Sequence, residues 1–430
     1  MGRAQANWRR ALAGACMVAV TFIAADRPST DQVKPLRSPV NLNHILALVE
    51  SLQMGGRQVT YVNIYAEHPA YKPVAASGEG ISAVDDVGRL LEVLETEILV
   101  YGHSDLLPLT RGLTQFLLEM QREDGLWYNF IRADGSINTT HRNSAAGFGW
   151  WAARGLRGLA AAYCIFRDRD PEFAGALQTR FQRADRHLQA SLAGYPALIP
   201  TAHGQRASWL PQDAPDMSAE FLLALAKMTR HSELDYREQI GLLAEGLMTY
   251  QLRDPESPAD GMFYSWNNRW HNWGNLQALA LLEAFSFSQD STLLQAVERW
   301  ADGFLRWEAD QGYLWEVTAA SVTQLATVPF PQIAYGIGSS FKGIHRLASL
   351  TGQTRYNRLA QRLLGWFSGD NRAGQSMYDA ATGRCYDGIN GPDEVNLNSG
   401  AESTIEALQA LQFAHPIQNE PERQPDDPGR

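Results

Sequence analysis

The chain has 430 residues, of which 45% are hydrophobic and 20% charged, and its formal net charge at pH 7 is −10. This composition allows a large hydrophobic core and excludes a chain that is disordered over most of its length. The acidic balance makes nucleic acid an unfavourable partner, because a negative surface repels the phosphate backbone.

The beginning of the chain has the pattern of a signal peptide. Arg9 and Arg10 precede an uncharged run from Ala11 to Ala25, which is shorter than the roughly 20 residues that span a bilayer. We expect residues 1–25 to be removed on export to the periplasm or the cell exterior, with a linker at 26–40. The alternatives are an uncleaved anchor, a wrongly assigned start codon and a lipid anchor at Cys16. The lipid anchor is less favoured because few apolar residues precede that position.

After the linker, apolar residues recur with the period of an α-helix. The pattern predicts twelve helices, at 41–54, 82–100, 105–121, 143–166, 172–193, 216–230, 234–251, 271–287, 290–308, 332–351, 354–368 and 398–413. One member of each pair is rich in Ala, Gly and Leu, as at 155–162, and its partner is amphipathic, as at 293–305. Small residues on every side favour an inner helix, and an amphipathic pattern favours an outer one.

The predicted inner helices begin near 82, 143, 216, 271, 332 and 398, which is a loose internal repeat. The last inner helix has no helix after it, and residues 41–54 can supply the missing partner. The sequence therefore predicts an all-α fold, a closed (α/α)6 barrel spanning 41–415 as one domain. The tail at 416–430 has too few apolar residues to fold.

Five long connections precede inner helices, at 122–142, 194–215, 252–270, 309–331 and 369–397. They should gather at one mouth of the ring, and long loops in a compact domain are usually functional. The inner helices also direct their N-terminal N–H groups toward this mouth. We therefore expect the functional site there.

Carboxyl groups cluster at the predicted starts of the inner helices. We expect Asp86 and Glu402 to carry catalysis, with Asp216 in reserve, because the first and last inner helices are neighbours in a closed ring. Each has a structural alternative. Asp85 and Glu402 both lie three residues after a serine, the spacing of a capping box, and Asp216 follows a proline as a helix cap does.

Aromatic and polar residues at the same positions are candidates for binding a substrate. We expect substrate contacts from Trp127, His141, Trp151, Trp270, His271, Gln332, Tyr335 and Asn398. The alternative is that part of this set forms core, since a helical ring also needs buried aromatic residues, and each histidine is as well explained by a structural role.

Several short motifs resemble the six-hairpin glycosidase superfamily. They are Trp127-Tyr128-Asn129-Phe130, Gly149-Trp150-Trp151, Trp270-His271 with Trp273-Gly274, the run from Gln332 to Gly336 and the run from Gly400 to Thr404. The Asp85-Asp86 pair and the run from Asn398 to Thr404 are similar to helical-toroid proteins encoded with glycan-processing enzymes. The resemblance implies carbohydrate hydrolysis by two carboxyl groups, without identifying one family.

The sequence predicts a glycoside hydrolase that acts on an oligo- or polysaccharide with one carboxyl group as acid and another as base or nucleophile. A polysaccharide lyase or uronate epimerase is the first alternative, with Tyr335, His141 and Arg142 in the cleft. A non-catalytic glycan-binding protein is the second. No P-loop, no dinucleotide-binding glycine motif and no Cys/His zinc spacing occur, so no cofactor or metal is expected.

Overall fold

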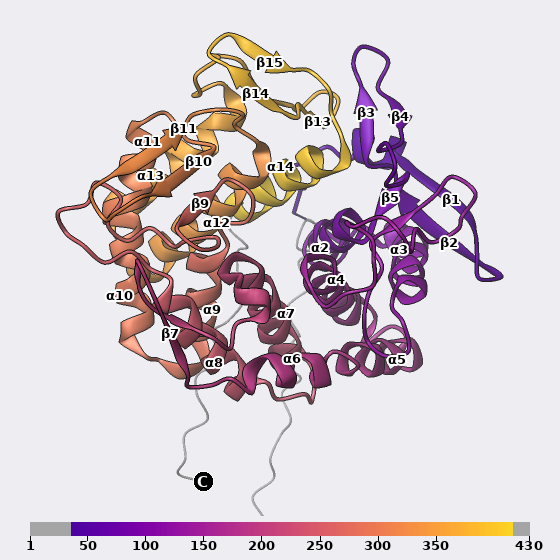
Figure 1. The fold of residues 1–430 in the computed structure, drawn as a ribbon. Coiled ribbons are helices and arrows are strands. Elements are labelled where there is room, and N and C mark those ends of the chain that lie inside the picture. Colours follow the sequence, from indigo (N-terminus) through magenta and orange to yellow (C-terminus); the bar gives the residue numbers. More distant parts are fainter. Residues whose placement is uncertain (1–35, 416–430) are drawn as a thin grey trace, which may run out of the picture. The chain divides into compact units, whose positions relative to one another are not determined.

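Six helices form a closed inner ring in the computed structural model of the chain, which describes residues 36–415 (Figure 1). They are α2 (Val84–Leu99), α4 (Trp150–Phe166), α7 (Pro215–His231), α9 (Gln277–Ser288), α12 (Ala334–Thr351) and α14 (Ala401–Ala414). Each packs against the next, and α14 returns to α2. The predicted (α/α)6 arrangement is confirmed.

An outer layer follows the inner helices along the chain. It comprises α3 (Leu107–Met120), α5 (Pro171–Gln182) with α6 (Asp185–Leu192), α8 (Arg237–Thr249), α10 (Ser291–Trp300) and α13 (Thr354–Gly365). The helix α10 continues through a π-helical stretch, η3 (Ala301–Leu305), into α11 (Arg306–Asp310). Short 3-10 turns stand at η1 (Ser104–Leu106), η2 (Pro211–Asp213) and η4 (Trp366–Ser368). The outer helices α3, α5, α8, α10 and α13 each pack on the inner helix before them.

The helix predicted at 41–54 is wrong over most of its length. Only α1 (Asn43–Ala47) is helical, and β1 (Val49–Met54) pairs with β2 (Arg57–Val62) as an antiparallel hairpin that packs on α3. Gly55 and Gly56 both have positive φ and form the turn, a conformation that glycine adopts without steric cost. The short α1 still contacts α14, as expected of the closing partner.

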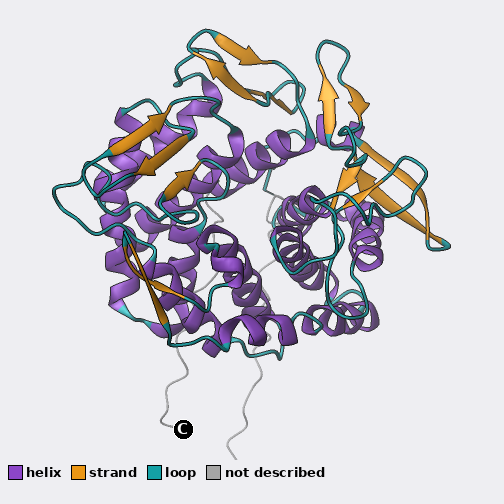
Figure 2. Ribbon diagram, in the orientation of Figure 1, coloured by secondary structure: helices purple, strands orange, loops and turns teal. Residues whose placement is uncertain are grey.

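The long connections carry small antiparallel strands, shown in orange in Figure 2. The strands are β3 (Tyr65–Glu67), β4 (Lys72–Val74), β5 (Ser82–Ala83), β6 (Phe130–Ile131), β7 (Leu198–Thr201), β8 (Gly204–Ala207), β9 (Arg269–His271), β10 (Glu316–Ala319), β11 (Leu325–Val328), β12 (Tyr378–Asp379), β13 (Arg384–Cys385), β14 (Gly388–Gly391) and β15 (Glu394–Asn396). They precede the inner helices in the chain, and we call the end at which these helices begin the hairpin end. Two inner helices begin later than predicted, α4 at Trp150 and α9 at Gln277.

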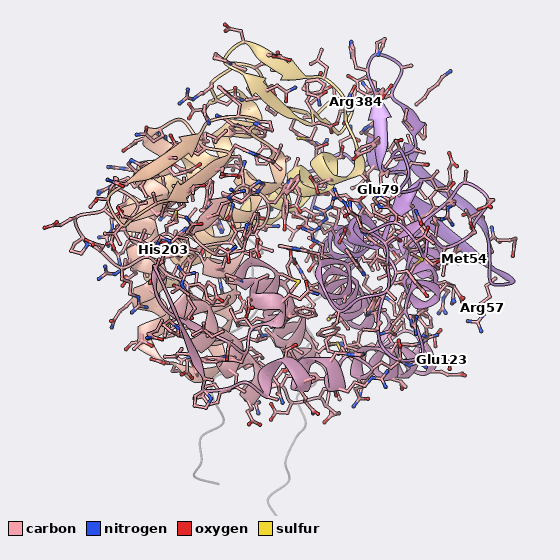
Figure 3. The ribbon with its side chains drawn as sticks, viewed as in Figure 1. Met54, Arg57, Glu79, Glu123, His203 and Arg384 are labelled. Atoms are coloured by element: carbon pink, nitrogen blue, oxygen red, sulfur yellow. The ribbon has the colours of Figure 1, made fainter. Side chains whose placement is uncertain are left out.

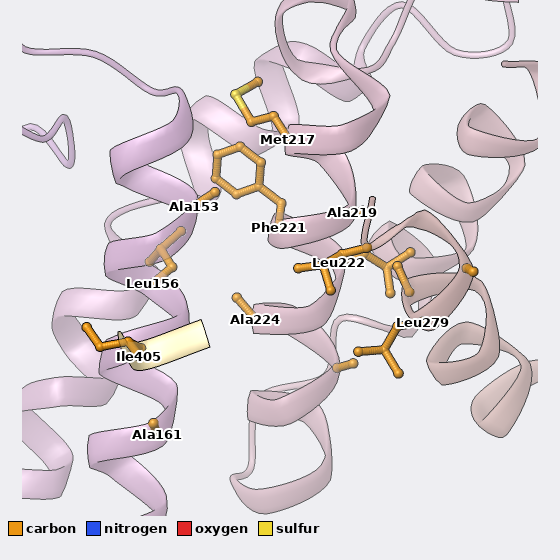
Figure 4. Packing of buried hydrophobic residues seen from close by; sticks show 14 of the residues in the cluster. Ala153, Leu156, Ala161, Met217, Ala219, Phe221, Leu222, Ala224, Leu279 and Ile405 are labelled. Carbon is orange, nitrogen blue, oxygen red and sulfur yellow. The ribbon is translucent and has the colours of Figure 1, made fainter. Parts of the chain in front are cut away.

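Small side chains allow the inner helices to pack closely. In Figure 4, Phe221 of α7 points toward Ala153 of α4, and Leu222 and Leu279 fill the space between α7 and α9. All four side chains are buried. The alanine and leucine residues that predicted these inner helices are therefore the residues that pack between them.

Gly88 allows α2 to pack closely against the backbone of α4. A Cβ atom added at Gly88 would lie 2.3 Å from the backbone oxygen of Arg154. We expect Gly88→Ala to lower the free energy of unfolding by about 1–3 kcal/mol, because the two backbones must separate. The matched control is Gly175→Ala on α5, where no atom lies within 4 Å of the added Cβ. That control should raise stability by about 0.5–1 kcal/mol. Urea unfolding of both variants measures the difference, and equal stabilities would contradict the close approach.

Both cysteines of the described part are buried free thiols. Cys164 lies on α4 and Cys385 on β13, and they form no disulfide. Within residues 36–415, no helix is long and apolar enough to cross a membrane. The predicted signal peptide at 1–25, most of the linker at 26–40 and the tail at 416–430 lie outside the described residues, so these remain predictions.

Candidate active site

Asp86 and Glu402 converge on one arginine at the hairpin end. Asp86 lies in the first turn of α2 and Glu402 in the first turn of α14, and these helices are neighbours. Nη2 of Arg89 donates hydrogen bonds to Oδ1 of Asp86 at 2.7 Å and to Oε2 of Glu402 at 3.1 Å. The two accepting oxygens are therefore at most about 6 Å apart, which is below the separation of about 6.5–9.5 Å in inverting glycosidases.

The helix-capping alternative is wrong for Asp85 and Glu402. Neither α2 nor α14 has a side-chain hydrogen bond at its N-cap. Asp85, expected to form a capping box with Ser82, instead accepts a hydrogen bond from Nδ2 of Asn129 at 2.9 Å and pairs with Arg154 at 3.3 Å. Neither carboxyl group is used by a helix cap, and each pairs instead with an arginine of another inner helix.

The two carboxyl groups differ in their surroundings. Asp86 is 6% exposed, and burial raises its pKa to about 7 although the neighbouring Arg89 opposes the shift. Negative charge on Glu402 and Asp85 raises the pKa of Asp86 further. The side chain of Glu402 is 43% exposed. One group can therefore carry a proton near neutral pH while the other faces solvent.

Residues of α14 and α12 fix the position of Arg89 through a network of hydrogen bonds. Its Nη1 donates to Oε1 of Glu406 at 3.2 Å, and Nζ of Lys342 donates to Oε2 of Glu406 at 3.3 Å and to Oε1 of Gln409 at 2.8 Å. The Nε2 group of Gln409 donates to the backbone oxygen of Arg89 at 2.9 Å. All four residues are at least nine-tenths buried, so the arginine beneath the carboxyl pair has a fixed position.

A second buried network includes Tyr335, which was predicted to bind substrate. The Tyr335 hydroxyl accepts a hydrogen bond from Nη2 of Arg154 at 2.7 Å and donates one to Oε1 of Glu220 at 3.1 Å. Arg157 pairs with Glu220 and with Glu92. Burial raises the pKa of Tyr335, whereas Arg157 and Arg154 outweigh the burial of Glu220 and lower its pKa to about 2. Tyr335 is therefore buried, and both of its hydroxyl hydrogen bonds are made within the protein.

Asp216 lies on α7, against the loop that precedes α9. Its Oδ1 accepts the N–H of Met217 at 2.8 Å, and its Oδ2 is buried with no hydrogen-bond partner among the described residues. Burial raises the pKa of Asp216 well above its ordinary value. A Cβ added at Gly274 would lie 3.1 Å from the Asp216 Cβ, which locates this acid next to the Trp273–Gly274 turn. Asp216 therefore lies beside the loop on the α9 side of the ring, and the charges of Arg154 on α4 and Glu220 on α7 also influence its pKa.

An aromatic cluster lies on that side and consists of His271 with Trp266, Trp273 and Trp315. The ring centroid of His271 is 5.3 Å from that of Trp266, 4.9 Å from that of Trp273 and 4.4 Å from that of Trp315. Burial lowers the pKa of His271 to about 4, so the imidazole is neutral at pH 7. Trp273 is 50% exposed. His271 is thus placed beneath an accessible indole ring.

Three predicted contact residues are buried and have no surface for a ligand. Trp127 is fully buried, and Trp270 is 3% exposed with its ring 5.1 Å from that of Phe304. The Gln332 amide donates to the carbonyl of Gly312 at 2.8 Å and accepts from the indole of Trp366 at 3.2 Å. For these residues the structure agrees with the alternative role as core, because the two indole rings are buried and internal hydrogen bonds already use the Gln332 amide.

Three other predicted residues stay at the hairpin end. The indole N–H of half-buried Trp151 donates to the Trp127 carbonyl at 2.7 Å. His141 is 3.8 Å from Glu79, and Oδ1 of Asn398 accepts the N–H of His68 at 3.0 Å. Their roles in binding stay predictions. Trp266 and Trp315 were not predicted, because each lies within a long loop and not at the expected start of an inner helix. Pairing of Glu316 with His271 between β10 and β9 brings Trp315 to the cluster.

Two tryptophans three residues apart provide a direct test of the aromatic cluster. We expect Trp273→Ala to weaken sugar binding by about 10-fold with little change in stability, because its exposed face contributes contact area rather than core packing. Trp270→Ala should instead cost at least about 3 kcal/mol of stability, because it leaves a cavity beside Phe304. Isothermal titration with an oligosaccharide and thermal unfolding separate the two effects. Equal losses of stability would place Trp273 in the core.

A closed ring of six inner helices, with the long strand-bearing connections at one end, defines the (α/α)6 toroid class. Among solved structures, the chain is similar to cellobiose 2-epimerase from Bacillus thermoamylovorans B4167, with 12% identity over 87% of this chain and 95% of that one, and a TM-score of 0.64. Cellobiose 2-epimerase from Spirochaeta thermophila DSM 6192 gives 12% identity, 87% and 93% coverage and a TM-score of 0.60. A D-mannose isomerase gives 12% identity over 82% of this chain and 90% of that one, with a TM-score of 0.55.

These likenesses concern the fold, because identities of 12% do not carry activity from one chain to another. No family model matches the sequence, and no curated protein matches it either. Within residues 36–415, no group of three or more His, Cys, Asp or Glu side chains is arranged to hold a metal ion.

Proposed function

We propose that this protein is a carbohydrate-active enzyme, and specifically a glycoside hydrolase that uses Asp86 and Glu402. One observation carries the proposal: two carboxyl groups from the first and last inner helices meet on Arg89, one buried and one exposed. Glycoside hydrolysis needs one carboxyl group that holds a proton and a second that acts as base or nucleophile, and here a buried carboxyl group with a raised pKa lies beside an exposed one.

The separation of the two groups favours a retaining mechanism. Asp86 donates its proton to the glycosidic oxygen as the bond from that oxygen to the anomeric carbon breaks. An oxygen of Glu402 forms an ester bond to the anomeric carbon. Water then attacks this carbon, Asp86 takes the proton from the water, and the ester bond to Glu402 breaks. Arg89 stabilises the negative charge that Asp86 carries between the two steps.

An aldose epimerase or isomerase is the second candidate, and His271 favours it. A neutral imidazole beside an exposed tryptophan can remove a proton from the carbon next to a sugar carbonyl group. The similar solved structures include two cellobiose 2-epimerases. The lyase or uronate epimerase predicted as an alternative is disfavoured, because Tyr335 is buried and its hydroxyl is hydrogen-bonded on both sides. A non-catalytic glycan-binding protein is the remaining alternative, and it would use the aromatic cluster to bind sugar without using the carboxyl pair.

Product analysis distinguishes these functions. The chain is incubated with neutral oligosaccharides in D₂O, and the products are analysed by mass spectrometry and by a reducing-end assay. New reducing ends and shorter products support the hydrolase. Unchanged length with deuterium on a sugar carbon supports the epimerase and contradicts the hydrolase. Binding without any product would leave only a glycan-binding role.

Export is a separate part of the proposal and rests on the pattern of residues 1–25. N-terminal sequencing of the protein from its native host should begin near Asp26. Recovery of an intact Met1 would contradict cleavage. Retention of a lipid on Cys16 would identify the anchored alternative.

A further inference from the structure

We propose that the sugar unit bound between Asp86 and Glu402 is uncharged, so that the substrate is a neutral glycan rather than a polyuronate or a sulfated glycan. The inference rests on the proposed function and concerns the substrate class of the same site. It follows from how the cations around the two carboxyl groups are already used and from the excess of acids among their neighbours.

Arg89 has little capacity left for a substrate anion. Its Nε donates to the backbone oxygen of Asp85 at 3.1 Å, and its two terminal nitrogens bind Asp86, Glu402 and Glu406. The Arg89 side chain is 3% exposed. A carboxylate or sulfate on the substrate would therefore have to displace one of the enzyme's own carboxylates to reach this guanidinium.

Three further buried cations, all on inner helices, are paired as well. Arg154 is 3.3 Å from Oδ1 of Asp85 and 3.5 Å from Oε1 of Glu220, and it stacks on the Trp150 ring at 4.9 Å. Arg157 forms ion pairs with Glu92 and Glu220. Lys342 pairs with Glu406. Each of these cations already interacts with an acid of the ring.

The acids in these contacts outnumber the cations. The four cations are Arg89, Arg154, Arg157 and Lys342, and the six acids that pair with them are Asp85, Asp86, Glu92, Glu220, Glu402 and Glu406. Even with Asp86 protonated, the network keeps a formal excess of negative charge. Such an excess disfavours binding of a second anion and has no such effect on a hydroxyl group.

Further acids lie close to the pair at the hairpin end. Oδ1 of Asp387 accepts hydrogen bonds from the N–H of Gly400 and from the Ser403 hydroxyl, at the start of the helix that carries Glu402. Burial raises the pKa of Tyr65, and the negative charges of Glu79, Asp86, Glu402 and Asp387 raise it further. Figure 3 labels Glu79 on this side of the ring. These acids therefore all lie near Tyr65, and Glu79 and Asp387 add negative charge beside the carboxyl pair.

Matched glycosides test this inference. The full chain is assayed at low ionic strength with the 4-nitrophenyl glycosides of glucose and glucuronic acid, and of galactose and galacturonic acid. We expect kcat/KM to be at least about 10-fold higher for the neutral member of a pair. Glu79→Gln should reduce this preference several-fold, because it removes one negative charge near the site. The control is Glu123→Gln, an exposed acid after α3 that Figure 3 also labels, which should leave the preference unchanged.

The outcomes separate the inference from the function on which it rests. Equal or faster turnover of the acidic member overturns the neutral-substrate inference and leaves the hydrolase in place. If neither member is hydrolysed, the proposed hydrolase fails for these substrates. The inference is then decided by tryptophan-fluorescence titration with methyl glucoside and methyl glucuronoside. Tighter binding of the glucuronoside overturns it.

Discussion

Replacing Asp86 by Asn or Glu402 by Gln is expected to lower kcat by about 10²–10⁴-fold while the ring remains folded. Each substitution keeps the shape of the side chain and removes its ability to exchange a proton or to act as a nucleophile. An amide oxygen can still accept a hydrogen bond from Arg89, which now bonds to both carboxyl groups. Substrate binding should therefore change much less than turnover.

The pH dependence of kcat tests the proposal that Asp86 is the acid. Its pKa is raised to about 7 by burial, so the proton is present below pH 7 and lost above it. In the wild-type enzyme, kcat should fall as pH rises through 7. The residual activity of Asp86→Asn should lack this decrease, because an amide does not titrate.

The raised pKa of Asp86 also makes the free energy of unfolding depend on pH. The folded chain holds the Asp86 proton at pH values where the unfolded chain, with an ordinary aspartate pKa, has lost it. Asp86 therefore destabilises the fold as pH rises from about 4 to 7. Asp86→Asn should remove that contribution and should be no less stable than the wild type at pH 8.

A surface substitution provides the control for both variants. Asp168, whose side chain is 82% exposed in the link after α4, can be changed to Asn. It should retain normal kcat at every pH. Near-normal turnover by either Asp86→Asn or Glu402→Gln would instead show that the pair has a structural role.

The ring could be predicted from the sequence because its packing leaves a strong composition pattern. Segments such as 155–162 contain little besides Ala, Gly and Leu, and helices that touch neighbours on every side need such residues. The prediction failed at 41–54, where apolar residues also fit a helix. There the Gly55-Gly56 turn and the β-branched residues Val59, Thr60 and Val62 favour the hairpin that forms.

The carboxyl pair was predictable from ring closure, whereas its supporting network was not. Asp86 and Glu402 open the first and last inner helices, which a closed ring brings together. Arg89 and Lys342 lie on two different inner helices, and the sequence around each cation gives no sign of its partner. The partners Glu406 and Gln409 come from a helix more than 300 residues away from Arg89.

Arg89→Met is expected to lower the free energy of unfolding by about 3–5 kcal/mol at pH 8, because it leaves buried carboxylates without their cation. Asp86 and Glu406 are 6% and 1% exposed, so water does not replace the lost hydrogen bonds. The loss should be smaller at pH 5, where Asp86 is protonated and one of the unpaired charges is absent.

Urea unfolding at pH 5 and pH 8 measures the effect of Arg89→Met, with Arg237→Met as the control. Arg237 forms an exposed pair with Asp235 on the outer surface, with side-chain exposures of 64% and 59%, and such pairs contribute little. Adding Glu406→Gln to Arg89→Met should recover part of the stability at pH 8, because it removes one buried charge. Arg89→Lys should recover less than the original arginine, because one ammonium group cannot reach all three carboxylates in the geometry of the guanidinium. An equal loss at both pH values would mean that Arg89 stabilises the ring by packing and not by neutralising the acids around it.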